Sequence, residues 1–122
     1  MQIFLSHSSN FDYQNELYLP IKTKFSEIID LFVFPEELKT NTKEIIRSSD
    51  LFFCEISHKS VGSAIETGWA DAFNKPIYCF YKYGSSPSSS FRYLTNKIYE
   101  YKSIEDLLEI MESIIKNQSI NI

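Results

Sequence analysis

The sequence lacks several features that would assign it to a special class. It contains no run of about 18 or more apolar residues, the length that a membrane-spanning helix needs. Its opening, MQIFLSHSS, has neither the basic segment nor the long apolar segment of a signal peptide. Lys and Arg number only 12 against 16 Asp and Glu, and a net charge of −4 disfavours binding to a nucleic-acid polymer. These absences predict a cytoplasmic protein that binds neither a membrane nor DNA or RNA.

Cysteine and histidine are also scarce, with two residues of each. Cys54 and Cys79 both fall within apolar runs that resemble central strands, so we expect two small core residues rather than a disulfide. The two histidines and two cysteines do not have the spacing of a metal-ligand set. We therefore expect neither a metal ion nor another cofactor.

What the sequence does contain is ample material for a hydrophobic core. Hydrophobic residues make up 43% of the chain and aromatic residues 16%. The length is close to the commonest size of a domain, and we interpret residues 1–122 as one domain. Pro20 is expected to kink the first of its helices. Apolar runs predict strands at 2–5, 31–34, 50–56, 76–82 and 97–101, and helical periodicity predicts helices at 13–29, 42–49, 62–74 and 103–117.

The alternation of strands and helices predicts the fold. Strands that are each followed by a helix indicate a parallel sheet with right-handed crossovers. The expected class is α/β: a flavodoxin-like three-layer sandwich around a five-stranded parallel sheet of order 2-1-3-4-5. In such sheets ligands bind beyond the carboxyl ends of the strands where the strand order reverses, here between the first and third strands.

Two loops rich in serine and histidine follow these two strands, SHSSNFD and SHKSVGS. Gly62 would let the backbone approach a ligand, and the N–H groups at the start of the next helix suit an anion. Glu66 is expected in the first turn of that helix, facing the crevice, and Gly68 is expected to let the helix approach the sheet closely. The candidate ligand contacts in the two loops are Ser6, His7, Ser60, Gly62 and Ser63.

The segment SVGSAIETGWADAFNKPIYCFYK resembles the signature of nucleoside 2-deoxyribosyltransferases and of their relatives, the 2'-deoxynucleoside 5'-phosphate N-hydrolases. The family pattern Ser-x-Gly-x-x-x-Glu-x-Gly corresponds here to Ser60, Gly62, Glu66 and Gly68. The preceding DLFFCEIS is similar to the Asp-led apolar strand of the family. The resemblance extends over nearly the whole chain, with a looser match in the first 45 residues.

The resemblance implies a covalent mechanism at an N-glycosidic bond. Glu66 would attack the anomeric carbon of a ribosyl or deoxyribosyl group and displace the base. Water would then complete a hydrolysis, and a second base would complete a transfer. In relatives that take 5'-phosphates, serines bind the phosphate, and the matching residues are Ser60 and, from a neighbouring subunit, Ser90. The implied partners are a small-molecule nucleoside or nucleotide and further copies of the chain, in a dimer or larger homo-oligomer.

Two positions depart from the family pattern. A tyrosine of the first strand is replaced by the pair Ile3-Phe4, and an aspartate ahead of the third strand is replaced by Thr42. His7 is the candidate replacement as general acid, because the ordinary pKa of histidine lies near neutrality. Glu36 or Glu37, which follow the second strand, are further candidates for this acid–base work, and Glu36 is also a candidate for substrate contact.

Alternatives remain open. The opening IFLSHSSNFD resembles TIR domains, which share this sheet order and some of which cleave the N-glycosidic bond of NAD with a glutamate at a comparable position. The two departures would also fit a non-catalytic module that senses a nucleotide or assembles with partners. In the plainest interpretation, Glu66 is only an acidic residue favoured near a helix N-terminus.

Overall fold

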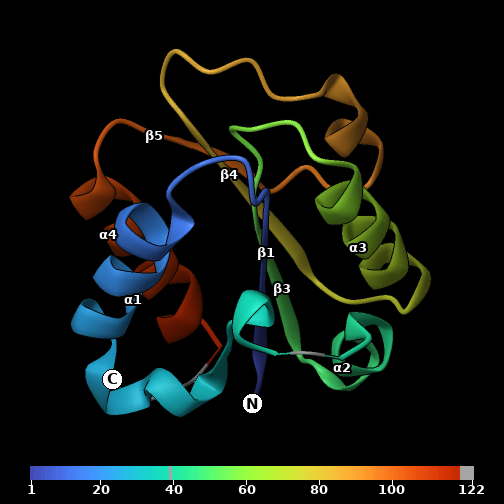
Figure 1. The fold of residues 1–122 in the computed structure, drawn as a ribbon, viewed down its shortest axis with the longest axis horizontal. Helices are drawn as coiled ribbons and strands as arrows, with labels where there is room; N and C mark the ends of the chain where they lie inside the picture. The colour runs from blue at the N-terminus through green and yellow to red at the C-terminus, as the bar shows by residue number, and fades with distance from the viewer. Residues whose placement is uncertain (39, 119–122) are drawn as a thin grey trace.

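The computed structural model describes residues 1–38 and 40–118 (Figure 1). Its centre is a five-stranded parallel sheet of order β2-β1-β3-β4-β5, so the predicted α/β, flavodoxin-like arrangement and its strand order are confirmed. The predicted domain of residues 1–122 also includes positions that lie outside the described residues. The strands are β1 (Ile3–His7), β2 (Phe32–Val33), β3 (Leu51–Glu55), β4 (Ile77–Lys82) and β5 (Ile98–Tyr101).

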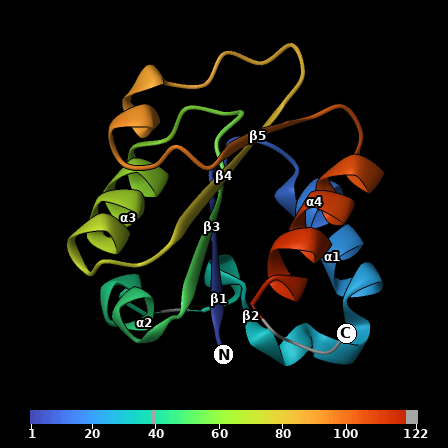
Figure 2. The ribbon, with the colours of Figure 1, turned by 180° about the vertical axis from the view of Figure 1, so that it is seen from behind.

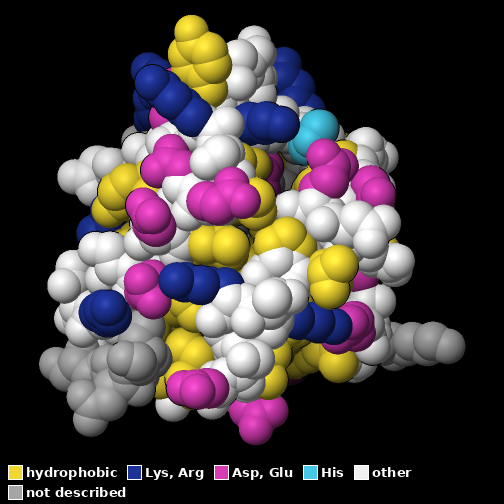
Figure 3. All heavy atoms as spheres, turned by 90° about the vertical axis from the view of Figure 1, so that its left-hand side faces the viewer, with side chains coloured by type: hydrophobic (Ala, Val, Ile, Leu, Met, Phe, Trp, Pro, Cys, Tyr) yellow, Lys and Arg dark blue, Asp and Glu magenta, His cyan; other side chains and the backbone are white. Residues whose placement is uncertain are grey.

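Helices cover both faces of the sheet, which gives the three layers (Figures 1 and 2). One face carries α1 (Leu19–Lys24) and α4 (Ile104–Lys116), and the other carries α2 (Thr42–Ser48) and α3 (Val61–Ala72). Over α1 and α4, basic and acidic side chains are interspersed (Figure 3). Within residues 1–38 and 40–118, no helix is both long enough and apolar enough to cross a membrane.

The helix expected at 13–29 changes from π to α geometry just before Pro20, and its interruption lies further on, at Phe25, whose φ and ψ are −107° and 32°. The π-helix η1 (Gln14–Tyr18) precedes α1, and the 3-10 helix η2 (Ser26–Leu31) follows it. Pro20 has no N–H to donate and its ring crowds the carbonyl of the preceding turn, and the wider π turns lie directly before it. Two further 3-10 helices follow β2 and β4, namely η3 (Pro35–Glu37) and η4 (Ser89–Tyr93).

The alternation of side chains along the strands separates two hydrophobic cores. Ile3 and Leu5 of β1 face the core beneath α1 and α4, whereas Phe4 faces the core beneath α2 and α3. Phe4 stacks on Phe52 of β3 with ring centroids 5.6 Å apart. The second core also holds the two cysteines as buried free thiols, as predicted, so the central strands are covered on both sides.

Three local expectations differ from the structure. Strand β1 continues through His7, so Ser6 and His7 belong to the strand and not to the loop after it. Helix α3 begins at Val61 with Ser60 as its N-cap, which places Glu66 in the second turn and not in the first. Close packing against the sheet does not require Gly68, because a Cβ at this position would meet no described atom within 4 Å. The sequence located the helix and its start to within one residue, but not the turn that carries Glu66.

Candidate active site

Glu66 is the centre of a hydrogen-bonded cluster that joins three elements. Ser6 Oγ of β1 donates to Oε1 of Glu66 at 2.8 Å. Thr42 Oγ1, at the start of α2, donates to Oε2 at 2.8 Å. Ser6 is fully buried, and the other two residues are half-buried. Each carboxylate oxygen therefore receives one hydroxyl donor, which fixes the orientation of the carboxylate.

Local capping explains why Thr42 reaches this position. Asn41 is the N-cap of α2, and its Oδ1 accepts a hydrogen bond from the N–H of Lys43 at 2.8 Å. Thr42 is consequently the first helical residue, and its side chain points toward α3, on which α2 packs. The resembled family has an aspartate here. Threonine supplies a donor to Glu66, whereas an ionised aspartate would only accept.

The surroundings of Glu66 favour the neutral carboxyl group overall. Burial raises the pKa of Glu66, the hydrogen bonds from Thr42 and Ser6 lower it, and the negative charge of Glu36 raises it further. The net direction is upward. A helix dipole acts mainly on the first turn, so it does not account for a carboxylate in the second turn that two other elements hold. This carboxylate is costly to ionise, and it is held in one orientation.

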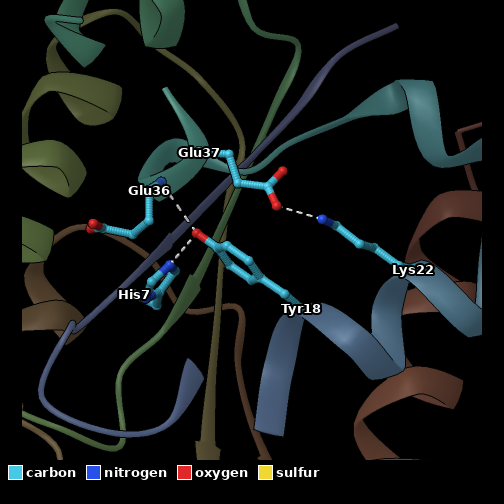
Figure 4. Close-up of polar contacts among 5 residues, drawn as sticks. All are labelled: His7, Tyr18, Lys22, Glu36 and Glu37. Carbon is cyan, nitrogen blue, oxygen red and sulfur yellow. Dashed lines mark hydrogen bonds and ion pairs between the residues drawn. The ribbon is translucent and has the colours of Figure 1, made fainter. Parts of the chain in front are cut away.

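His7 lies on the opposite face of the sheet from Ser6, because consecutive residues of a strand alternate. Its Nδ1 hydrogen-bonds to the carbonyl oxygen of Ser8 at 2.7 Å, and its Nε2 to Tyr18 Oη at 2.5 Å (Figure 4). A carbonyl only accepts, so Nδ1 carries the proton and Nε2 accepts from Tyr18. His7 is 5% exposed, and burial lowers its pKa. The structure therefore presents His7 as a neutral ring bonded to Ser8 and Tyr18, not to Glu66.

The charge of Glu36 acts on Glu66 and on His7, which lie on opposite faces of the sheet. Glu36 belongs to η3, directly after β2, and its backbone N–H donates to Tyr18 Oη at 3.3 Å. Its carboxylate raises the pKa of Glu66 and also opposes the lowering of the pKa of His7. In Figure 4 the side chains of Glu36 and Glu37 point in opposite directions, and Glu37 pairs with Lys22 at 2.5 Å. Of the two glutamates that follow β2, Glu36 is therefore the one whose charge acts on Glu66.

A cavity of about 580 Å³ lies between the start of α3 and η4. Ser60 and Ser90 both line it, and both belong to the same chain. Ser60 Oγ accepts a hydrogen bond from the N–H of Ser63 at 3.2 Å, which leaves its own hydroxyl proton for another acceptor. Ser63 is 3% exposed, whereas Gly62 is exposed at the second position of α3. Arg92 lines a neighbouring cavity and not this one.

The predicted residues thus fall into three groups. Ser6 and Glu66 meet directly, Ser60 and Ser90 share a cavity that Glu66 does not line, and His7 lies behind the sheet. Among the described residues, no group of three or more His, Cys, Asp or Glu side chains is arranged to hold a metal ion. The predicted site residues are therefore not all brought together in one cavity.

Sequence reasoning missed two residues of this region, Thr42 and Tyr18. In the sequence, Thr42 is only a departure from the family's aspartate, and its contact with Glu66 follows from the packing of α2 on α3. Tyr18 offered no local signal, because it is one of several apolar positions of a predicted helix. Its hydrogen bonds to His7 and Glu36 arise only when η1 packs beside β1 and η3.

No protein-family model matches the chain, and no curated protein matches it in sequence. Among solved structures, the chain is similar to the CMP N-glycosidase BcmB of Clostridium botulinum. The TM-score is 0.66 at 20% sequence identity, and the match covers 92% of this chain and 99% of that one. At this identity the likeness establishes a shared fold along nearly the whole of both chains.

Proposed function

We propose that the protein cleaves the N-glycosidic bond of a nucleoside or nucleoside 5'-monophosphate, with Glu66 as the nucleophile. The observation that carries the proposal is the cluster of Ser6, Glu66 and Thr42. A half-buried carboxylate is costly to ionise, and this one, on α3, lies beside β1 and α2, near the point where the strand order reverses. The family pattern around Glu66 and the fold shared with an N-glycosidase support the same reaction class.

The first step forms a bond between a Glu66 oxygen and the anomeric carbon of the sugar. The bond from that carbon to the base nitrogen breaks, and its electron pair leaves with the base. The transition state carries positive charge on the sugar, and the ionised carboxylate of Glu66 stabilises this charge. Glu36 donates a proton to the departing base and becomes ionised. The result is a free base and a glycosyl ester on Glu66.

The second step regenerates the enzyme. Water attacks the anomeric carbon, and Glu36 accepts the proton that the water loses. The bond between the sugar and Glu66 breaks, and its electron pair returns to the carboxylate, which Ser6 and Thr42 again stabilise. The proton now on Glu36 serves the next turnover. If a second base attacks instead of water, the same intermediate gives a transfer.

A phosphate on the substrate would bind at the start of α3. The hydroxyl protons of Ser60 and Ser90 can donate to phosphate oxygens in the cavity that both serines line. The first N–H groups of this 12-residue helix favour an anion. In this proposal both serines come from one chain, so a homo-oligomer is not needed to bring them together. A nucleoside 5'-monophosphate is therefore the preferred substrate class.

The test is base release measured by chromatography. Wild type, Glu66→Gln and the matched control Glu44→Gln are incubated with nucleosides, ribo- and deoxyribonucleoside 5'-monophosphates and NAD, with and without an acceptor base. Glu44 is exposed on α2 and pairs with Arg47, so its substitution leaves the cluster intact. Release by wild type and control but not by Glu66→Gln is expected, with a glycosyl adduct on Glu66 found by mass spectrometry of acid-quenched enzyme.

The other outcomes separate the alternatives. Equal release by Glu66→Gln would remove Glu66 from the chemistry. Release of nicotinamide from NAD alone would favour the TIR-like activity over the nucleotide substrate. Binding of a nucleotide without turnover at any enzyme concentration would favour a sensing module.

A further inference from the structure

We infer that Tyr18, held by His7 from behind the sheet, is the residue that positions Glu36 for the proposed acid–base step. This inference rests on the proposed function. It assigns to His7 the role of a positioning residue in place of the general acid expected from its type. One continuous chain of hydrogen bonds joins Glu36, Tyr18 and His7 (Figure 4).

The hydrogen bonds of this chain can be assigned donors and acceptors in only one way. The Glu36 N–H donates to Tyr18 Oη at 3.3 Å, and Tyr18 Oη donates its one proton to His7 Nε2 at 2.5 Å. His7 Nδ1 then donates to the carbonyl of Ser8 at 2.7 Å. Every donor has an acceptor, and no ring nitrogen of His7 is left to exchange a proton with a substrate. A histidine used in this way cannot serve as a general acid without breaking the chain.

Both members of the chain are rigidly held. Tyr18 is 3% exposed and His7 is 5% exposed. The His7 ring meets Tyr18 edge-on at 5.0 Å between centroids, and Tyr13 closes its other side at 4.7 Å. Tyr18 also packs edge-on against Phe34, the residue directly before η3, at 4.8 Å. The hydroxyl that receives the Glu36 N–H is therefore fixed by packing on several sides.

The segment η3 is short, and it is exposed beyond its buried first residue, Pro35. It has three residues, and both of its glutamates are exposed. A further attachment is the ion pair of Glu37 with Lys22, whose side chains are 51% and 38% exposed, and such pairs contribute little. The hydrogen bond to Tyr18 Oη is part-buried and its acceptor belongs to a buried side chain, so it constrains the backbone of Glu36 more than the exposed ion pair does. With Glu37 turned toward Lys22, the Glu36 side chain extends to the other side, where its charge acts on Glu66.

Tyr18→Phe is the direct test, because it removes the hydroxyl and keeps the ring. We expect kcat for base release to fall about threefold to tenfold, the value of one hydrogen bond, with KM changed less than twofold. Tyr13→Phe is the matched control, since its ring also packs on His7 but its hydroxyl takes no part in the chain. Hydrogen exchange of the Glu36 amide should accelerate in Tyr18→Phe and not in the control.

A double-mutant cycle separates positioning from general loss of structure. Glu36→Gln removes the acid–base group and should lower kcat about a hundredfold. If Tyr18 acts through Glu36, Tyr18→Phe has no further effect on kcat in the Glu36→Gln background. Additive effects would overturn the inference, and so would equal kcat for Tyr18→Phe and Tyr13→Phe. A wild type that releases no base from any substrate overturns the proposed function itself, which distinguishes the two failures.

A second pair of variants keeps the test usable if Tyr18→Phe does not fold. In His7→Gln, the amide oxygen can replace Nε2 as the acceptor for Tyr18, whereas His7→Leu removes the acceptor. We expect kcat of His7→Gln to exceed that of His7→Leu by about threefold to tenfold. Glutamine cannot act as a general acid. Equal loss of kcat in both variants would overturn the positioning role and restore His7 as the acid.

Discussion

Thr42→Val is the sharpest test of the cluster around Glu66, because valine keeps the shape of threonine and removes only the donor to Oε2. A hydrogen bond to a charged group contributes about 1.5–3 kcal/mol. The site is half-buried, so we take the lower end, about 1.5 kcal/mol. That is about a tenfold change in the equilibrium between ionised and protonated Glu66.

The sign of the effect follows from which form the hydroxyl stabilises. Thr42 and Ser6 donate to the ionised carboxylate and lower its pKa, against the larger opposite effect of burial. Loss of one donor therefore raises the pKa of Glu66 further. In the proposed mechanism Glu66 attacks in its ionised form, so the acid limb of the profile of kcat/KM against pH should move to higher pH in Thr42→Val. Activity should recover substantially at pH values well above this limb.

The assay has a part that needs no substrate. Side-chain carboxyl carbons of ¹³C-labelled glutamate are titrated by NMR, and Glu66 is assigned by its absence in Glu66→Gln. Thr23→Val is the matched control, because Thr23 donates to the Leu19 carbonyl on exposed α1. The expected result is a higher Glu66 pKa in Thr42→Val alone. An unchanged Glu66 titration in Thr42→Val, with the protein folded, would refute the claim that Thr42 stabilises the ionised nucleophile.

Three further predictions concern the same region. The folded-state pKa of Glu66 is raised, so ionised Glu66 opposes folding at higher pH. Glu66→Gln should therefore raise Tm by about 2–4 °C at pH 7 and by less at pH 4. An equal Tm of variant and wild type at pH 7 in thermal melts would contradict this. Ser60→Ala should cost about 1 kcal/mol of unfolding free energy in denaturant melts, because it removes the α3 N-cap. It should also raise KM for a 5'-monophosphate more than for the nucleoside, as should Ser90→Ala without the capping cost; equal changes would exclude phosphate binding. In Gly62→Ala and Gly68→Ala the added Cβ makes no close contact, so each substitution should stabilise the fold by about 0.5–1 kcal/mol. Only Gly62→Ala should raise KM. Equal KM values in the two variants would remove Gly62 from the ligand site.

The sequence by itself determined the sheet and its helices. Short apolar runs and helical periodicity are local properties, and the alternation of strands with helices admits few topologies, so the order 2-1-3-4-5 followed. Burial of Cys54 and Cys79 followed in the same way from the apolar runs that contain them. The pattern from Ser60 to Glu66 identified the helix that carries the candidate nucleophile, because a short motif lies within one turn-and-helix unit.

Only the tertiary structure decided which side chains meet. Ser6 and Glu66 are 60 residues apart and Thr42 and Glu66 are 24 apart, and their contacts depend on how α2 and α3 pack against β1. Strand β1 extends two residues beyond the predicted strand and includes Ser6 and His7, so their side chains point to opposite faces of the sheet. The composition of the segment does not reveal this. Hydrogen bonds between distant side chains depend on strand register and helix placement. Those are properties of the packed molecule as a whole, whereas periodicity is a property of each segment alone.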